Sequence, residues 1–146
     1  MRLWHKDLIP YLPNQQLLGQ WKEIFMVKGC LEKKGATNHF IVSYCDDANP
    51  LDIVSYGLLV KKEMNERGFN TDNKKWIKFI EYFMPDVLIS EPLVFLAQRN
   101  IFKREHNEEY LRICYRNLRE KFIRGRIDQD DWDRFQSGYT YLVKYA

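Results

Sequence analysis

The sequence predicts an all-α protein, a single compact helical domain that takes in residues 1–146. Apolar side chains recur at helical spacing in several segments, and residues that favour helix ends separate those segments. The hydrophobic fraction of 45% and the aromatic fraction of 15% suffice for a packed core and exclude a disordered chain. Because no repeat, low-complexity segment or flexible linker divides the chain, we expect one core.

The N-terminal segment, residues 1–11, is an arm rich in aromatic and apolar side chains, which should pack on the body of the protein. Asn14 is a good N-cap and predicts a helix that begins at about residue 13 or 14 and runs to Lys28. The apolar residues of this helix form one stripe of a 3.6-residue period: Leu17, Leu18, Trp21, Ile24 and Phe25. We expect this stripe to face the core.

Glu23 is the residue of this helix that bears most on function. It lies roughly 200° from the middle of the apolar stripe, on the same face as Gly19. Because glycine weakens a helix interior by about 1 kcal/mol, Gly19 suggests that another chain or a ligand approaches this face. The alternative is that Glu23 is an ordinary solvated carboxylate, which is the commoner role for an exposed glutamate.

The middle of the chain contains two helices. Residues 29–49 are predicted to be irregular, with a brief β-like run at 40–44. Asn49 then caps a helix that has Pro50 at its first position and is ended by Gly68 in the left-handed conformation. A third helix follows and is stopped by Pro85, and its periodic apolar residues are Trp76, Ile77, Ile80, Phe83 and Met84.

The last third of the chain is also predicted to be helical. A short helix is expected at residues 90–100. Asn107 caps a long helix that Gly125 ends, with a buried seam of Leu111, Cys114, Leu118 and Phe122. Asp128 can start another turn before the aromatic tail YTYLVKYA.

Several classes of site are excluded by what the sequence lacks. It contains no glycine-rich phosphate loop, and His5, His39 and His106 do not have the spacing of metal ligands. We therefore expect no nucleotide cofactor, no other cofactor and no bound metal. A histidine-dependent hydrolytic triad cannot be argued from three scattered histidines either.

Charge, cysteine spacing and hydropathy limit the location and the partners. The net charge is only +3, so nucleic-acid binding would have to rest on a local basic patch. Cys30, Cys45 and Cys114 are widely spaced, which argues against a disulfide framework and indicates a reducing cytoplasm. No apolar run approaches the roughly 20 residues of a membrane span. We expect a cytoplasmic protein without a membrane partner.

One combination of residues could perform chemistry. The α-amine of Met1 has an ordinary pKa near ~7.7–8.0, so part of it is a free nucleophile at neutral pH and could form a Schiff base with a sugar or an aldehyde. Glu23 could stabilise a cationic intermediate and transfer protons. Four basic residues could neutralise phosphates around them: Arg2, Lys22, Lys33 and Lys34. The alternative for Lys33 and Lys34 is a solvated helix end.

A second basic feature lies on the helix that begins near residue 107. Arg112, Arg116 and Arg119 fall within about 60° of one another and form a stripe of like charge. Phosphate contacts could offset the repulsion within this stripe. Pairing of Arg112 with Glu108, and of Arg116 with Glu120, is an equally good explanation.

The stretch LPNQQLLGQWKEI, residues 12–24, resembles the pyrimidine-dimer DNA glycosylases, the phage endonuclease V-like family. The shared frame comprises Leu12, Gln15, Leu17 and Glu23, with Trp21 in place of tyrosine and Lys22 in place of arginine. The sequence RGFN at residues 67–70 also matches. The opening residues, the KKGAT loop and EHNEEYLRICYRNL at residues 105–118 are similar to a bacterial branch of the family.

The resemblance implies a compact all-helical domain whose N-terminal arm passes between helices and places the terminal amine beside Glu23. It implies that Glu23 is the catalytic glutamate, that Lys22 contacts a phosphate, and that Arg2 corresponds to the arginine after the nucleophilic residue. Since residue 2 is a bulky charged residue, which normally prevents methionine removal, the amine is expected to be that of Met1.

The leading hypothesis is a DNA repair N-glycosylase/AP lyase that acts as a monomer on damaged or abasic duplex DNA, associated with the nucleoid when it acts. Met1 and Glu23 are the expected catalytic residues. The expected DNA-binding residues are Arg2, Gln15, Lys22, Lys33, Lys34, Arg112 and Arg116. The alternative is a non-catalytic helical module on the same scaffold that binds nucleic acid or a protein.

Overall fold

The computed structural model describes residues 2–33, 50–85 and 101–145. Within these ranges the chain contains helices and no strands, so the predicted all-α class is confirmed. One 3₁₀-helix comes first and five α-helices follow: η1 (Lys6–Tyr11), α1 (Asn14–Glu32), α3 (Pro50–Glu66), α4 (Asn73–Phe83), α6 (Glu108–Ile123) and α7 (Gln129–Tyr145).

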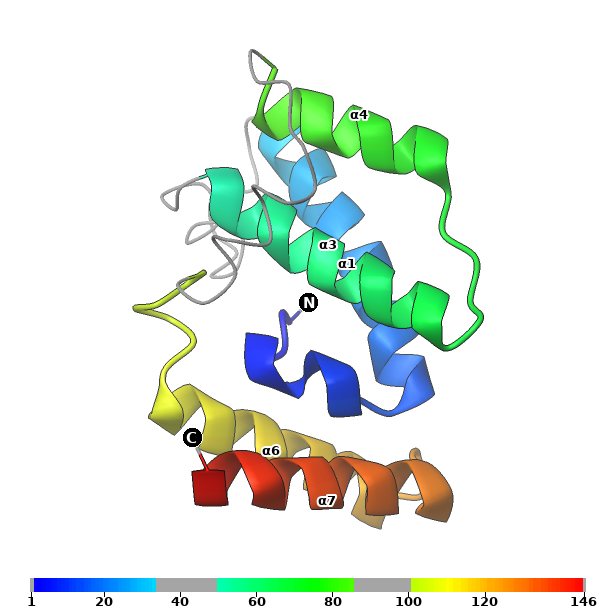
Figure 1. Ribbon diagram of the computed structural model, residues 1–146, viewed down its shortest axis with the longest axis vertical. Coiled ribbons are helices and arrows are strands. Elements are labelled where there is room, and N and C mark those ends of the chain that lie inside the picture. Colours follow the sequence, from blue (N-terminus) through cyan, green and yellow to red (C-terminus); the bar gives the residue numbers. More distant parts are fainter. Residues whose placement is uncertain (1, 34–49, 86–100, 146) are drawn as a thin grey trace.

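The helices form two groups with the N-terminal arm between them (Figure 1). Helices α1, α3 and α4 pack on one another, while α6 and α7 lie side by side as a pair. The arm, residues 2–12, includes η1, which contacts α3 on one side and α7 on the other. The prediction that the arm packs between helices is therefore confirmed.

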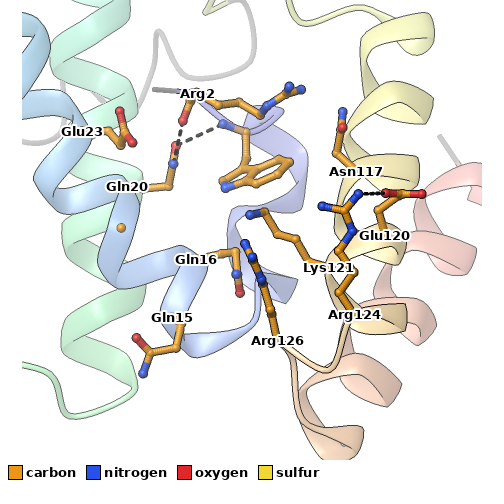
Figure 2. A pocket seen from close by; sticks show the side chains of 12 residues that line it. Arg2, Gln15, Gln16, Gln20, Glu23, Asn117, Glu120, Lys121, Arg124 and Arg126 are labelled. Atoms are coloured by element: carbon orange, nitrogen blue, oxygen red, sulfur yellow. Dashed lines mark hydrogen bonds and ion pairs between the residues drawn. The ribbon is translucent and has the colours of Figure 1, made fainter.

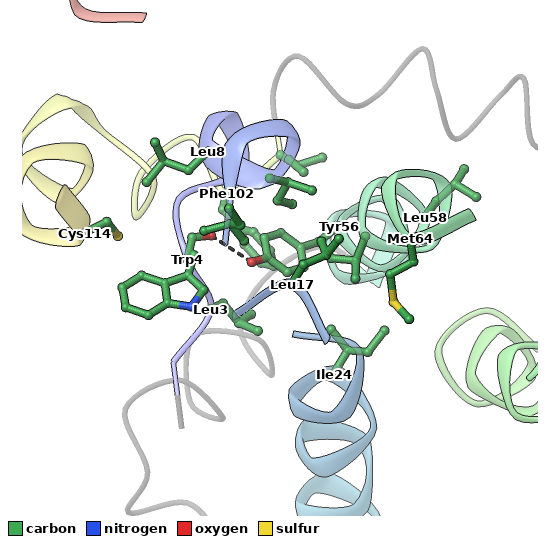
Figure 3. Packing of buried hydrophobic residues seen from close by; sticks show 14 of the residues in the cluster. Leu3, Trp4, Leu8, Leu17, Ile24, Tyr56, Leu58, Met64, Phe102 and Cys114 are labelled. Carbon is green, nitrogen blue, oxygen red and sulfur yellow. Dashed lines mark hydrogen bonds between the residues drawn. The ribbon is translucent and has the colours of Figure 1, made fainter. Parts of the chain in front are cut away.

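The arm is part of the core. Leu3, Leu8, Ile9 and Leu12 are each almost completely buried, and Trp4 is nearly so. Their neighbours include Tyr56 of α3 and Leu17 of α1 (Figure 3). Since burial of a leucine or isoleucine side chain stabilises a fold by about 1.5–3 kcal/mol, the arm is held firmly against both groups of helices.

Helix α1 begins at Asn14, as predicted, but Asn14 is not its cap and the helix ends later than predicted. Asn14 is its first residue rather than its N-cap, because its amide nitrogen donates to Asp131 of α7 and its side-chain oxygen accepts from Arg67. The helix continues four residues past Lys28 to Glu32, and these two residues form an ion pair at 2.6 Å. Residues 29–32, predicted to be irregular, are thus helical.

The buried face of α1 is also rotated from the predicted stripe. Its buried residues are Leu17, Gln20, Ile24 and Val27, whereas Leu18, Trp21 and Phe25 are only half-buried. Glu23 consequently lies roughly 80° from the centre of the buried face and not opposite to it. It is half-buried at the edge of the core, so the interpretation of Glu23 as a freely solvated carboxylate is wrong.

The middle helices follow the sequence closely. Gly68 has a φ of +84° and ends α3 as predicted. In α4 the side chain of Asp72 accepts hydrogen bonds from the first turn, and Trp76 and Phe79 are buried. Ile77 was predicted to face the core but is 54% exposed, because the helix turns its Trp76–Phe79 edge towards α1 and α3.

Helices α6 and α7 cover the side of the arm opposite to α1, α3 and α4 (Figure 1). Asn107 caps α6, and Leu111, Cys114 and Leu118 form the predicted buried seam. Helix α7 is far longer than the single turn predicted after Asp128, and it includes most of the aromatic tail. Packing overrides the weak helix propensity of that tail, since the ring of Tyr11 lies where a Cβ on Gly138 would be.

Some predicted elements lie outside the described residues: the β-like run at 40–44, the short helix at 90–100 and the cap residue Asn49. Among the helices that the structure does describe, none has the length and apolar character needed to cross a membrane.

Candidate functional site

An open cleft of about 630 Å³ lies where the arm, α1 and α6 meet (Figure 2). One wall is formed by the arm and α1, and the other by the C-terminal half of α6 and the loop that follows it. The cleft is lined by Arg2, Trp4, Gln15, Gln16, Gly19, Gln20, Glu23, Asn117, Glu120, Lys121, Arg124 and Arg126.

The α1 wall carries Glu23 on the same helix face as Gln16 and Gln20, because these positions are three, four or seven residues apart. Oε2 of Glu23 and Oε1 of Gln16 are buried, and neither accepts a hydrogen bond from any described residue. A buried acceptor without a donor is costly, on the order of 1–3 kcal/mol. Both oxygens are therefore available to a donor brought by a bound molecule.

Gly19 lies between these acceptors, and a Cβ at this position would meet no described atom within 4 Å. The glycine is therefore not required for packing against the described residues, in contrast to Gly57, where Trp76 lies 2.7 Å from a Cβ position. Its place in the cleft lining agrees with the expectation that space is kept on this face.

Gln20 joins the arm to α1. It is 2% exposed, and its Oε1 accepts from the amide of Trp4 at 3.0 Å while its Nε2 donates to the Arg2 carbonyl at 2.8 Å (Figure 2). These bonds tie the backbone of Arg2 and Trp4 to α1 at a position one turn before Glu23. Sequence reasoning missed Gln20, although a glutamine between Leu17 and Ile24 on a core-facing stripe was a visible signal.

The opposite wall is basic, with Arg124 and Arg126 exposed and Lys121 half-buried. Lys121 of α6 and Arg126 of the following loop extend towards α1 (Figure 2). Arg124 forms an ion pair with Glu120 at 3.2 Å, in which both side chains are about two-thirds exposed. Such a surface pair adds little stability. With Arg2, the cleft lining contains four basic and two acidic side chains, so it favours an anion.

The structure gathers only some of the predicted site residues. Arg2, Gln15 and Glu23 line the cleft. Lys22 of α1 and Lys33, which follows the helix, are exposed outside the lining, and Met1 and Lys34 lie outside the described residues.

Arg112 and Arg116 are exposed on a different face of α6, roughly 110° from the residues that line the cleft. Glu120 pairs with Arg124 and not with Arg116, so that part of the alternative explanation for the arginine stripe is wrong. The basic residues Lys121 and Arg126 of the opposite wall were missed because their position depends on how α6 packs.

A second polar junction lies at the base of the arm. His5 and His106 stack with ring centroids 5.3 Å apart. Nδ1 of His106 accepts from the amide of Lys6 at 3.0 Å, and Nδ1 of His5 accepts from that of Asp7 at 3.2 Å. Burial lowers the pKa of His106 to about 3, and it lowers the pKa of His5, on which the Asp7 carboxylate acts in the opposite direction. Both rings are therefore neutral at pH 7.

No described part of the chain brings three potential metal ligands of the His, Cys, Asp or Glu type together. The histidines at the base of the arm are used as acceptors of backbone hydrogen bonds. Cys114 is buried and Cys30 half-buried, and both are free thiols.

Fold and site together define an all-α protein with an anion-favouring cleft built around a half-buried carboxylate and an N-terminal arm. Residues 1–77, which include the arm, α1, α3 and the start of α4, match the family described as pyrimidine dimer DNA glycosylase. The chain belongs to this family of DNA repair enzymes, which act on damaged DNA. No curated protein and no solved structure matches the chain.

Proposed function

We propose that this protein is a DNA N-glycosylase/AP lyase that acts on damaged duplex DNA, with the α-amine of Met1 as nucleophile and Glu23 as the acid/base group. One observation supports this proposal above the others: Arg2, the residue bonded to residue 1, lines the same cleft as Glu23. The membership of the chain in a DNA glycosylase family supplies the substrate class.

The proposed reaction proceeds through an imine. The uncharged amine attacks C1′ of the damaged nucleotide, the C1′–N bond breaks, and the base leaves with the bonding electrons and takes up a proton. Loss of a proton from nitrogen and opening of the sugar ring give the imine. Removal of a proton from C2′ then expels the 3′ phosphate by β-elimination, which cuts the strand. Glu23 would transfer these protons and stabilise the cationic intermediate.

Covalent geometry supports the reach of the amine. Neighbouring Cα atoms are ~3.8 Å apart, so the amine of residue 1 is within one residue's span of Arg2 wherever that residue lies. The carbonyl of Arg2 is fixed to Gln20, and Gln20 precedes Glu23 by three residues on α1. On this ground we expect the amine to reach the carboxylate without a large movement of the arm.

The basic side chains would hold the DNA backbone. Arg2, Lys121 and Arg126 line the cleft and would contact phosphates next to the flipped or abasic nucleotide. The further predicted phosphate contacts would be made by Lys22, Lys33, Lys34, Arg112 and Arg116. Gln15, a neutral residue in the lining, would donate a hydrogen bond to the backbone.

The proposed activity is tested by borohydride trapping on a duplex that contains an abasic site. We expect a covalent adduct at the α-amine of Met1, located by mass spectrometry of the N-terminal peptide. A version with extra residues before Met1 converts the amine to an amide and should give no adduct. Salt-sensitive DNA binding without any adduct would contradict the proposal and support the non-catalytic binding module instead.

The remaining expectations belong to the same proposal. Residues 1–146 would act as one domain, since the described helices share one core, and as a monomer. The pyrimidine dimer is the first lesion to test in duplex DNA, because the description of the family names that lesion.

A further inference from the structure

The backbone of the arm is fixed at four points in three consecutive residues. Gln20 of α1 binds the Arg2 carbonyl and the Trp4 amide. Tyr110 of α6 donates to the Leu3 carbonyl, and the Tyr56 hydroxyl of α3 donates to the Trp4 carbonyl at 2.8 Å. Three helices from both groups therefore hold the same short segment.

The two bonds to Trp4, from Gln20 and from Tyr56, are buried, so water cannot replace them without opening the structure, whereas the bonds to Arg2 and Leu3 are part-buried. Gln20 is 2% exposed, and Tyr56 and Leu3 are completely buried. Burial raises the pKa of Tyr110, so its hydroxyl keeps the proton that it donates to Leu3. A buried carbonyl or amide left without its partner costs about 1–3 kcal/mol, which opposes any sliding of the arm.

Gln20 differs from the two tyrosines because of its place on α1. It precedes Glu23 by three residues on one rigid helix, so the distance from the arm to the carboxylate is set by a single helical turn. It also binds both Arg2 and Trp4, and it contacts the Tyr56 hydroxyl. Gln20, which holds the arm, and Glu23, whose carboxylate lies in the cleft, therefore move together.

We propose that Gln20 is a positioning residue, which sets the register of the N-terminal arm so that the terminal amine is held against Glu23, with Tyr110 as its counterpart on α6. This inference rests on the proposed function, because it assigns a purpose to the arm in the amine-dependent reaction. Gln20 itself contacts the backbone of Arg2 and Trp4, and it is not required to touch the substrate.

The test compares Gln20→Leu and Tyr110→Phe with wild-type protein. In Gln20→Leu the rate of borohydride-trapped adduct at saturating abasic DNA should fall on the order of 10- to 100-fold, because small misplacements of reacting groups have effects of this size. The dissociation constant for DNA should stay within about threefold of wild type, since the basic residues are retained. Tyr110→Phe should give a smaller loss of the same kind.

A second readout does not depend on activity. Hydrogen exchange of the Trp4 amide should be faster in Gln20→Leu than in wild type, because that amide loses its acceptor. Gln136→Leu is the matched control: Gln136 is exposed on α7 and outside the cleft lining, so neither the adduct rate nor the exchange should change.

Wild-type adduct rates in Gln20→Leu at saturating DNA would overturn the inference. If Gln20→Leu unfolds, the test rests on Tyr110→Phe. A wild-type adduct rate together with wild-type hydrogen exchange at residues 3–4 in Tyr110→Phe would then overturn the inference. If wild-type protein forms no adduct, the proposed function fails, and unchanged Trp4 exchange in Gln20→Leu would then reject the role of Gln20 separately.

Discussion

The two walls of the cleft are built in different ways. On the α1 side the arm is buried and its backbone is hydrogen-bonded to side chains, so Glu23 has a fixed relation to Arg2. On the α6 side Arg124 and Arg126 are exposed long side chains, and the ion pair between Glu120 and Arg124 faces solvent. Chemistry at C1′ requires accurate placement, whereas phosphate binding tolerates movement. Under the proposed function, catalysis would therefore belong to the first wall and anion binding to the second.

Glu23→Gln should have the largest effect. A positioned acid/base group contributes on the order of 100- to 10,000-fold to a rate, so strand incision under single-turnover conditions should fall by that factor. DNA affinity should be kept, because the substitution removes a negative charge from an anion-favouring cleft.

Glu32→Gln is the matched control for this prediction. Glu32 lies on the same helix in an exposed ion pair with Lys28, and its neutralisation should leave incision unchanged. Equal incision by wild type and Glu23→Gln would remove the catalytic assignment of the α1 wall.

Mild acid should destabilise the protein through the stacked pair His5 and His106 at the base of the arm. The pKa of His106 is lowered to about 3 by burial, so between pH 6.5 and 3 the unfolded chain binds a proton that the folded chain does not. Stability is therefore complete above pH 6.5 and falls as the pH decreases. Between pH 7.5 and 5 the free energy of unfolding should drop by about 2 kcal/mol through His106, measured by urea denaturation.

His5 should act in the same direction, because burial lowers its pKa as well. His106→Gln keeps an oxygen that can accept from the Lys6 amide and does not titrate, so it should reduce the pH dependence. An equally steep loss of stability in His106→Gln would assign the effect to other groups.

The sequence predicted best where one helix determines the result. Asn107 and Gly68 mark helix ends through local backbone geometry, and both predictions are confirmed. The seam of α6 followed from spacing alone. The length of α7 could not be predicted locally, because aromatic and β-branched residues are weak helix formers, and the contacts of Tyr139 with Tyr115 of α6 and of Gly138 with Tyr11 of η1 cannot be inferred from the segment itself.

The cleft itself was predictable only in part. Glu23 could be chosen as a candidate from the sequence, but its half-burial follows from the rotated buried face of α1, which includes Gln20. The basic wall was missed because Arg126 reaches the cleft through the turn after α6, which no spacing rule describes. A site formed by three segments can be predicted only when the packing angles between those segments are known.

Substitution of the basic wall should reduce affinity more than rate. Lys121→Gln and Arg126→Gln should each weaken DNA binding on the order of 10-fold at 0.1 M salt and reduce the salt slope by about 0.9, the value for one phosphate contact. Lys78→Gln on α4 is the control and should change neither quantity.

The same titration locates the DNA on α6. If Arg112→Gln and Arg116→Gln reduce the salt slope while Lys121→Gln and Arg126→Gln do not, the DNA follows the outer face of α6 and the division between the walls is incorrect.

The smallest effect comes from two glycines of α1. Among the described atoms, neither Gly19 nor Gly29 has a neighbour within 4 Å of a Cβ position, so alanine at either site should raise the free energy of unfolding by up to about 1 kcal/mol. Only Gly19 lines the cleft, so only Gly19→Ala should also slow incision, by several-fold, because its methyl group enters space next to Glu23. If Gly19→Ala and Gly29→Ala gave the same increase in stability and the same incision rate, the DNA would not approach the α1 wall at this turn. Glu23 would then have to act from the far edge of the cleft.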